Sequence, residues 1–153
     1  MAHDILIVDD EDDIRRQIAG ILEDEGYETR QAVNSAEAFA AINVRKPNLI
    51  ILDVWLRNSE HDGLQILEII HRENANQQVV MISGHGTFDM AVTAIKMGAY
   101  DFISKPFKTD VLLHTVTRTV EDTRLRQENE DLQQRTGDEI DELIGVSSAI
   151  NHL

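Results

Sequence analysis

The segment Leu49–Asp53, LIILD, places four large apolar residues directly before one carboxylate. An apolar run without helical or alternating periodicity is typical of a strand buried on both faces, as in a parallel sheet covered by helices. Asp53 then lies at the carboxyl end of this strand, the edge at which open α/β sheets bind ligands. On this segment alone two interpretations stand: Asp53 is a reactive group, or it only caps the following loop.

The flanking sequence repeats a pattern of strand, turn and helix. Residues 5–8 form a second all-apolar run, and further strands are expected over residues 27–33, 79–83 and 100–104. Each expected strand is followed by apolar residues at helical spacing, and Gly26 and Gly98 stop two of the helices. Five strands alternating with five helices require right-handed crossovers. The pattern therefore predicts an α/β domain of about 120 residues, with a five-stranded parallel sheet between two helical layers.

Composition limits the function of the 153-residue chain. It has no cysteine, which excludes disulfides, thiolate chemistry and cysteine-ligated metals. No apolar run approaches the roughly 20 residues that span a bilayer, and no signal-peptide pattern is present, so we expect a soluble, cytoplasmic protein without membrane association. The net charge of −14 would repel phosphate backbones and favours divalent cations, although much of the acidity only maintains solubility.

The composition changes after Val120. Residues 121–142 carry nine acids, three arginines and few hydrophobic residues, so this segment cannot pack on a core. Leu125, Asn129 and Leu132 fit a short heptad pattern, and we interpret the segment as a helical linker, either a coiled coil or a solvated helix. Residues 143–153 become apolar again and resemble the beginning of a further domain.

Polar residues follow four of the five expected strands. Asp9 and Asp10 follow the first strand, Asp53 ends the third, and Ser83 and Lys105 end the fourth and fifth. Each has an ordinary explanation as a turn former, a cap or a surface lysine, but their alignment at one edge favours a functional site. Carboxylates about 4 Å apart repel by roughly 4 kcal/mol per pair at an effective dielectric constant of 20, so the empty cluster is expected to be strained.

These motifs together resemble the receiver domain of two-component response regulators over residues 1–120. The matching segments are VDDE at 8–11, the lone Asp53, Ser83 after its strand, and KPF at 105–107. Residues 84–107 are most similar to NtrC-type transcription activators, especially the NtrX branch. In those proteins the receiver has the flavodoxin-like (CheY-like) doubly wound fold and precedes an AAA+ ATPase domain, whose opening residues 143–153 resemble, and a helix-turn-helix domain.

The resemblance implies that Asp53 is the phosphoacceptor for a phosphoryl group from a sensor histidine kinase. It implies Mg²⁺ as the cofactor, with Asp10 and Asp53 as direct ligands, Asp9 acting mainly through water and the carbonyl of Trp55 as a further ligand. Lys105 would pair with Asp53 before phosphorylation and with the phosphoryl group afterwards. The chain would then be a signalling phosphoacceptor rather than an enzyme, with only self-catalysed phosphotransfer and slow autodephosphorylation.

The resemblance also implies a conformational switch. Ser83 would hydrogen-bond the phosphoryl group and, by moving inward, free space for the side chain of Phe102 on the fifth strand. Because Phe102 has no hydroxyl, its part in the switch would be a change in burial and not a hydrogen bond. The fourth helix, fifth strand and fifth helix would form the readout face for homodimerisation, extended by the linker helix and controlling a transcription activator. The fragment itself would not bind nucleic acid. In the family, the peptide bond before Pro106 is commonly cis.

Three other classes of protein also place a carboxylate or a glycine-rich turn after a strand, or share the receiver fold. A phosphatase of the haloacid dehalogenase type needs an Asp two residues after its nucleophile, where Trp55 stands. A dinucleotide-binding fold is disfavoured because the Gly84-His85-Gly86 turn follows the fourth strand and Asp89 stands where the third glycine would be. A receiver-like interaction module that works without phosphorylation stays open as the alternative.

The loop after Asp53 departs from the family pattern. Ten positions run from Asp53 to Asp62, two more than usual, and the loop lacks the proline common there. This difference is expected to bear on kinase contacts or metal access. The bulky Trp55 is expected to shield an acyl phosphate from water, which predicts slow self-dephosphorylation.

Overall fold

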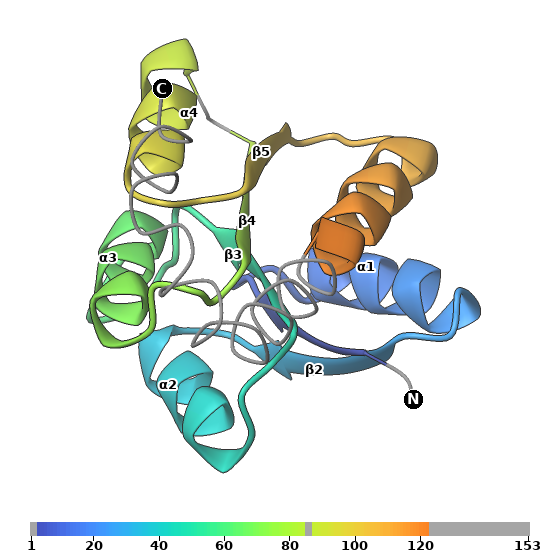
Figure 1. Cartoon of the computed structure of the whole chain (residues 1–153), viewed down its shortest axis with the longest axis horizontal. Helices are drawn as coiled ribbons and strands as arrows, with labels where there is room; N and C mark the ends of the chain where they lie inside the picture. The colour runs from blue at the N-terminus through green and yellow to red at the C-terminus, as the bar shows by residue number, and fades with distance from the viewer. Residues whose placement is uncertain (1–2, 85–86, 123–153) are drawn as a thin grey trace, which may run out of the picture. The chain divides into compact units, whose positions relative to one another are not determined.

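The computed structural model describes residues 3–84 and 87–122, and within them the predicted alternation of strands and helices is confirmed. The elements follow in the order β1 (Asp4–Val8), α1 (Asp12–Asp24), β2 (Glu28–Ala32), α2 (Ser35–Val44), β3 (Leu49–Asp53), α3 (Gly63–Glu73), β4 (Val79–Ser83), α4 (Phe88–Lys96) and β5 (Asp101–Ser104) (Figure 1). A fifth helix covers residues 109–122, up to the end of the described chain.

The five strands form one parallel sheet in the order β2-β1-β3-β4-β5. The strand order reverses between β1 and β3, which creates a crevice at the carboxyl ends of these two central strands. The register pairs Val8 with Leu52, Asp53 with Ile82 and Ser83 with Ser104. The residues that end these strands therefore share one edge of the sheet, as the sequence predicted.

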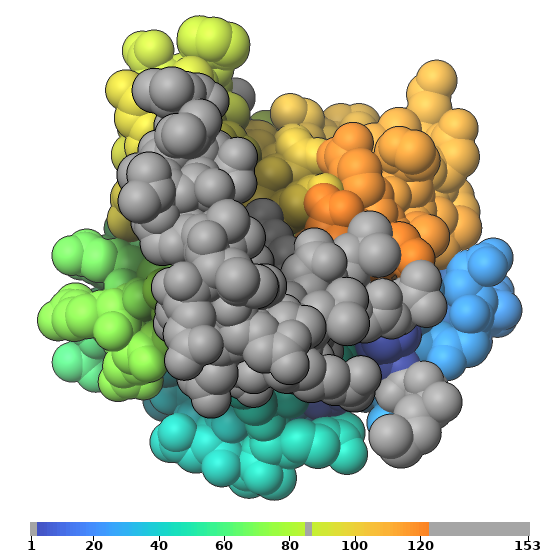
Figure 2. Space-filling view, viewed as in Figure 1, coloured from blue at the N-terminus to red at the C-terminus, as the bar shows by residue number. Residues whose placement is uncertain are grey.

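Helices cover both faces of the sheet and produce the three expected layers. On one side α2, α3 and α4 pack against the sheet, and on the other side α1 and the helix over residues 109–122 do so (Figure 1). Atoms of α2, α3 and the helix over residues 109–122 are visible at the surface in Figure 2. Alternate residues of the central strands enter the two cores, because successive side chains of a strand point to opposite faces. In β3, Ile50 and Leu52 enter one core and Leu49 and Ile51 the other.

Side-chain caps begin several of the helices. The Asn34 side chain accepts from the Glu37 N–H at 2.9 Å, as the spacing of these residues predicts. The Glu37 carboxylate, however, accepts from the N–H of Val33 at 3.1 Å, one residue before the cap. Thr87 caps α4 by accepting from the N–H of Met90. These bonds satisfy N–H groups that a helix leaves unpaired at its start.

Two of our assignments fall almost entirely outside the described residues. The chain divides into two units, Met1–Val120 and Glu121–Leu153, and only residues 121 and 122 of the second are described. The helical linker over 121–142 and the AAA+ beginning over 143–153 therefore stay predictions. Among the described helices, none has the length and apolar character needed to cross a bilayer.

The start of α3 is pressed against the end of β3, directly behind Asp53. The N–H of Gly63 donates to the carbonyl of Val54 at 2.8 Å, and Asp62 and Gln65 form a reciprocal capping box around this start. A Cβ at position 63 would overlap the backbone of Asp53 and Val54. Glycine is therefore required here for close approach of two backbones.

We predict that Gly63→Ala lowers the free energy of unfolding by about 2–4 kcal/mol, because backbone atoms cannot move aside as a flexible side chain does. Urea unfolding measures the change. Gly20→Ala is the matched control: apart from the chain of α1 itself, no atom of the described residues lies within 4 Å of its Cβ position on the exposed side of this helix. That variant should gain about 0.5–1 kcal/mol, as Ala replaces Gly in a helix. Equal stability of Gly63→Ala and the parent would contradict the packing described.

Candidate functional site

Three carboxylates meet at the carboxyl edge of the sheet. Asp9 and Asp10 follow β1, Asp53 ends β3, and one oxygen from each lies within 4.8 Å of the others. The side chains of Asp9 and Asp53 are only 1% and 5% exposed. The Asp9 carboxylate also accepts from the N–H of Glu11 at 2.8 Å. The fold thus brings together the acids that the sequence analysis selected.

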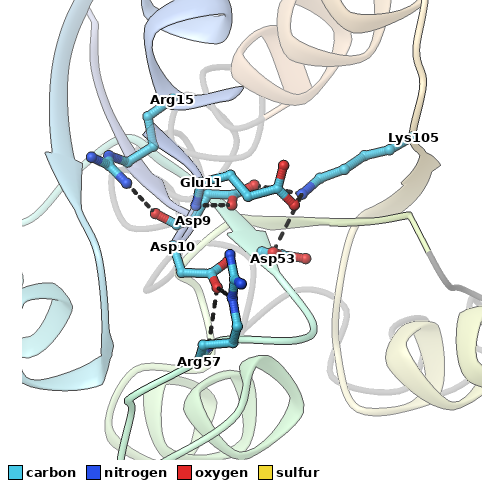
Figure 3. A network of polar contacts seen from close by, with 7 residues as sticks. All are labelled: Asp9, Asp10, Glu11, Arg15, Asp53, Arg57 and Lys105. Carbon is cyan, nitrogen blue, oxygen red and sulfur yellow. Dashed lines mark hydrogen bonds and ion pairs between the residues drawn. The ribbon is translucent and has the colours of Figure 1, made fainter. Parts of the chain in front are cut away.

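Lys105 is the cation at the centre of this cluster, and its side chain is 10% exposed. Its Nζ lies 2.7 Å from Asp9 Oδ2, 3.3 Å from Asp53 Oδ2 and 3.8 Å from a Glu11 carboxylate oxygen (Figure 3). Its backbone N–H donates to the Ser83 carbonyl, and its peptide bond to Pro106 is cis, as the resemblance implied. We expected Lys105 to pair with Asp53; it contacts both acids and lies closer to Asp9.

Asp53 remains electrostatically strained, because it shares the Lys105 cation with Asp9. Burial, followed by the charge of Asp9, raises the pKa of Asp53 to about 7, although the charge and hydrogen bond of Lys105 and the N–H of Trp55 oppose the rise. Burial alone would lower the pKa of Lys105, but its bonds and charge interactions with Asp9 and Asp53 raise it above its usual value. Lys105 is therefore firmly protonated, whereas Asp53 retains its proton unusually well.

Asp10 has a different cation, which the sequence analysis did not find. The Nε and the backbone N–H of Arg57 donate to Asp10 Oδ2 at 2.7 and 3.2 Å. Burial alone would raise the pKa of Asp10, but these bonds and the Arg57 charge lower it. The long loop signalled a departure from the family pattern, but no residue pattern indicated that Arg57 would fold back onto Asp10.

Arg15 is a second missed residue. Its guanidinium lies in the buried stripe of α1 and donates to the carbonyl of Asp9 at 2.7 Å and to the Gln31 side chain at 3.2 Å. It thereby fixes the backbone that carries the first two acids. The sequence does contain an indication of this role. Arg15 lies three residues before Ile18 and four before Ala19, so it shares with them a helix face that is otherwise apolar.

The long loop after β3 is tied to α2. The Ser59 hydroxyl accepts from the Ser35 N–H at 2.9 Å and donates to the His61 carbonyl at 2.7 Å, and the His61 ring lies edge-on to Phe39. Ser35 in turn accepts from the His61 N–H at 3.3 Å. The second half of the loop is therefore anchored, while Arg57 occupies the part next to the acids.

The remaining predicted residues surround the same edge. Ser83 is buried at the end of β4, and Phe102 on β5 is half-buried against the core on the side of α4. Trp55 is 49% exposed. A cavity of about 320 Å³ opens at the acids and is lined by Asp10, Glu11, Asp53, Trp55, Arg57, Gly84 and Lys105.

The donor set fits a hard divalent cation. Three carboxylates offer oxygen ligands within a space small enough for one ion, and the adjoining cavity has room for the waters that such an ion retains. The net negative charge of Asp9, Asp10 and Asp53 exceeds what Lys105 alone neutralises. The cluster can therefore hold a metal ion.

We predict that Asp53→Asn stabilises the metal-free protein, and more so at pH 8 than at pH 5. Between about pH 4, near the unfolded pKa, and about pH 7, the folded state keeps a proton that the unfolded state releases, so the parent loses stability as the pH rises. The neutral amide lacks this penalty. We expect a gain in Tm of roughly 3–8 °C at pH 8.

Thermal melts at both pH values, with and without Mg²⁺, test this expectation. A cation bound between the carboxylates should stabilise the parent more than the variant, so Mg²⁺ should reduce the difference in Tm between the two proteins. A lower Tm for metal-free Asp53→Asn at pH 8 would mean that the cluster is not strained.

Known proteins that are similar to this chain are consistent with a receiver-type site at this edge of the sheet. Residues 5–117 match the response regulator receiver domain family. The whole chain is 54% identical to the nitrogen assimilation regulatory protein NtrX of Azorhizobium caulinodans and covers 33% of that protein. A crystal structure of NtrX from Brucella abortus has a TM-score of 0.84 at 53% identity, over 88% of this chain and 31% of that one.

A second similar structure is the beryllofluoride-activated NtrC4 receiver domain dimer, with a TM-score of 0.74 and 38% identity over 78% of this chain and 98% of that one. The chain thus spans about a third of the NtrX proteins and nearly all of an isolated receiver. The family match covers well over half of the sequence, and the fold and acidic edge are those expected of it. The chain belongs to the family of response regulator receiver domains, and nitrogen regulators of the NtrX type are among its relatives.

Proposed function

We propose that this chain is the phosphorylation-dependent switch of a cytoplasmic two-component system, in which Asp53 accepts a phosphoryl group from a phosphohistidine of a sensor histidine kinase. The observation that supports the proposal is that Asp53 lies at an open cavity, between two further carboxylates and beside the mostly enclosed Lys105. Solvated acids on a helix surface would offer neither the strain nor the paired cation.

In the proposed reaction an Asp53 carboxylate oxygen attacks phosphorus. The new P–O bond forms as the P–N bond breaks, and the histidine imidazole of the kinase leaves. Mg²⁺, when bound, neutralises negative charge on the transferring phosphoryl group. Asp53 must be ionised to attack, and the Lys105 ammonium favours that form. After transfer, Lys105 is placed to pair with a phosphoryl oxygen.

The positions of the acids support a division of the proposed ligand roles. We assign Asp10 and Asp53 as direct Mg²⁺ ligands, with the Trp55 carbonyl as a third protein oxygen. Asp9 would act mainly through water, because one of its oxygens already contacts Lys105 at 2.7 Å and its side chain is almost fully buried. This division gives the metal the two acids that are not the primary partners of Lys105.

Ser83 and Phe102 form the proposed switch. Phe102 pairs with Met81, two residues before Ser83 on β4, so both side chains lie on the same side of the sheet. A Ser83 hydroxyl drawn toward the phosphoryl group would change the space open to Phe102. Phosphorylation would then shift the balance between two conformations of this region.

The proposed readout surface comprises α4, β5 and the helix over residues 109–122. It carries large apolar side chains in contact with solvent, Phe88 at 83% and Ile95 and Val111 at 46% exposure. Burial of such residues between two copies favours a homodimer. The relative that is described as an activated receiver dimer supports this output. Through the linker, dimerisation would control a transcription activator downstream.

The first test is intact-protein mass after incubation with a small acyl phosphate donor. We expect one added phosphoryl group that requires both Mg²⁺ and Asp53. Asp53→Asn should remain unmodified, whereas Asp24→Asn, which removes an exposed acid at the end of α1, should behave like the parent. No addition to folded protein, beside a working control receiver, would favour the interaction module that works without phosphorylation.

The second test concerns the lifetime of the phosphate. Trp55 is one of the residues that line the cavity, and if its bulky side chain shields the phosphate, Trp55→Asn should admit water and accelerate self-dephosphorylation several-fold. The decay of phosphorylated protein after removal of the donor gives the rate. Trp55→Phe retains an aromatic ring and should decay at nearly the parent rate. An unchanged lifetime in Trp55→Asn would show that Trp55 does not shield the phosphate.

A further inference from the structure

Two cations that differ in their exposure to solvent pair with the acids of the site. Lys105 is 10% exposed and holds Asp9 and Asp53 from the end of β5. Arg57 is 78% exposed and holds Asp10 from an irregular loop. Figure 3 shows the two side chains reaching the acids from different directions. One cation is thus mostly enclosed at the sheet edge and the other is accessible from solvent.

We propose that Arg57 is a releasable counter-cation that occupies Asp10 in the metal-free protein and competes there with Mg²⁺. The proposal rests on the metal site of the proposed function and adds a residue that sets its affinity. Binding of the metal would exchange the Arg57 contact for a metal contact at the same carboxylate. The loop residue would thereby be released only when the site is loaded.

The geometry supports competition rather than cooperation. Arg57 directs both its Nε and its backbone N–H at the same oxygen of Asp10, and it also lines the cavity through which a cation reaches the acids. The guanidinium and the metal are both positive, so the two repel each other as well as share a ligand. Simultaneous occupation of Asp10 is therefore unfavourable.

The exposure of Arg57 makes the contact easy to break. A long, solvated side chain loses conformational freedom when it is held in one geometry, and exposed ion pairs are screened by salt. The following residue, Asn58, has a φ of 53°, a left-handed conformation that Asn tolerates, and it turns the chain away toward the anchored part of the loop. Release of Arg57 therefore need not disturb the Ser59 contacts with α2.

Calorimetric Mg²⁺ titration of the unphosphorylated chain tests the competition. Arg57→Ala should bind Mg²⁺ about threefold to tenfold more tightly than the parent, since removal of a competing exposed charge has an effect of this order. Arg57→Lys keeps the charge without the Nε bond and should fall between them. Arg72→Ala is the matched control, because Arg72 is also exposed and pairs only loosely, at 4.0 Å, with Glu68 on α3. It should bind as the parent does.

A second readout follows the arginine directly. The Arg57 Nε–H, identified by its loss in Arg57→Lys, should give a protected NMR signal without metal and lose that protection as Mg²⁺ is added. Equal Mg²⁺ affinities of the parent and Arg57→Ala, or an Arg57 signal unaffected by Mg²⁺, would overturn the proposal while leaving the metal site intact. Absence of Mg²⁺ binding in every variant would overturn the metal site itself, and with it both proposals.

Discussion

The Lys105 ammonium shared between Asp9 and Asp53 is the interaction on which the functional edge depends. It joins the ends of β1, β3 and β5, and the three side chains are almost fully buried. One ammonium cannot neutralise both acids, and burial makes the remaining charge costly. The ammonium therefore holds the three strand ends together but leaves the site with a net negative charge. Such a site favours binding of a cation, or of an anionic group that binds together with a cation.

The opposite edge of the sheet shows that a buried carboxylate alone does not create this condition. Asp4, at the start of β1, is also buried, but Arg30 contacts both of its oxygens at 2.6 and 3.0 Å and Arg45 adds a contact at 3.2 Å. Here two guanidinium groups pair with one carboxylate. The same fold therefore carries a neutralised acid at its amino edge and an excess of negative charge at its carboxyl edge, and it is the excess that marks the site.

The sequence predicted those features that the topology makes unavoidable. An all-apolar run such as Leu49–Leu52 is typical of a central strand, and parallel strands place the residues after them at one edge. Asp9, Asp53 and Lys105 could therefore be grouped without any contact being known. Arg57 could not, because it ends no strand and its contact with Asp10 depends on the path of an irregular loop. Arg15 left a weak signal, a charge on an apolar helix face, that was not interpreted.

The packing of α4 suits the proposed switch. Ala94 is its only fully buried residue, whereas α3 buries Gly63, Ile66, Leu67 and Ile70. Elements with few buried contacts open at lower free energy. The C-terminal end of α4 is nevertheless fixed, because the His71 ring nitrogens lie 3.0 Å from the Met97 carbonyl and 2.8 Å from that of Gln77. A change that starts at Ser83, before the N-terminal end of α4, would therefore move that end more easily than the end held by α3.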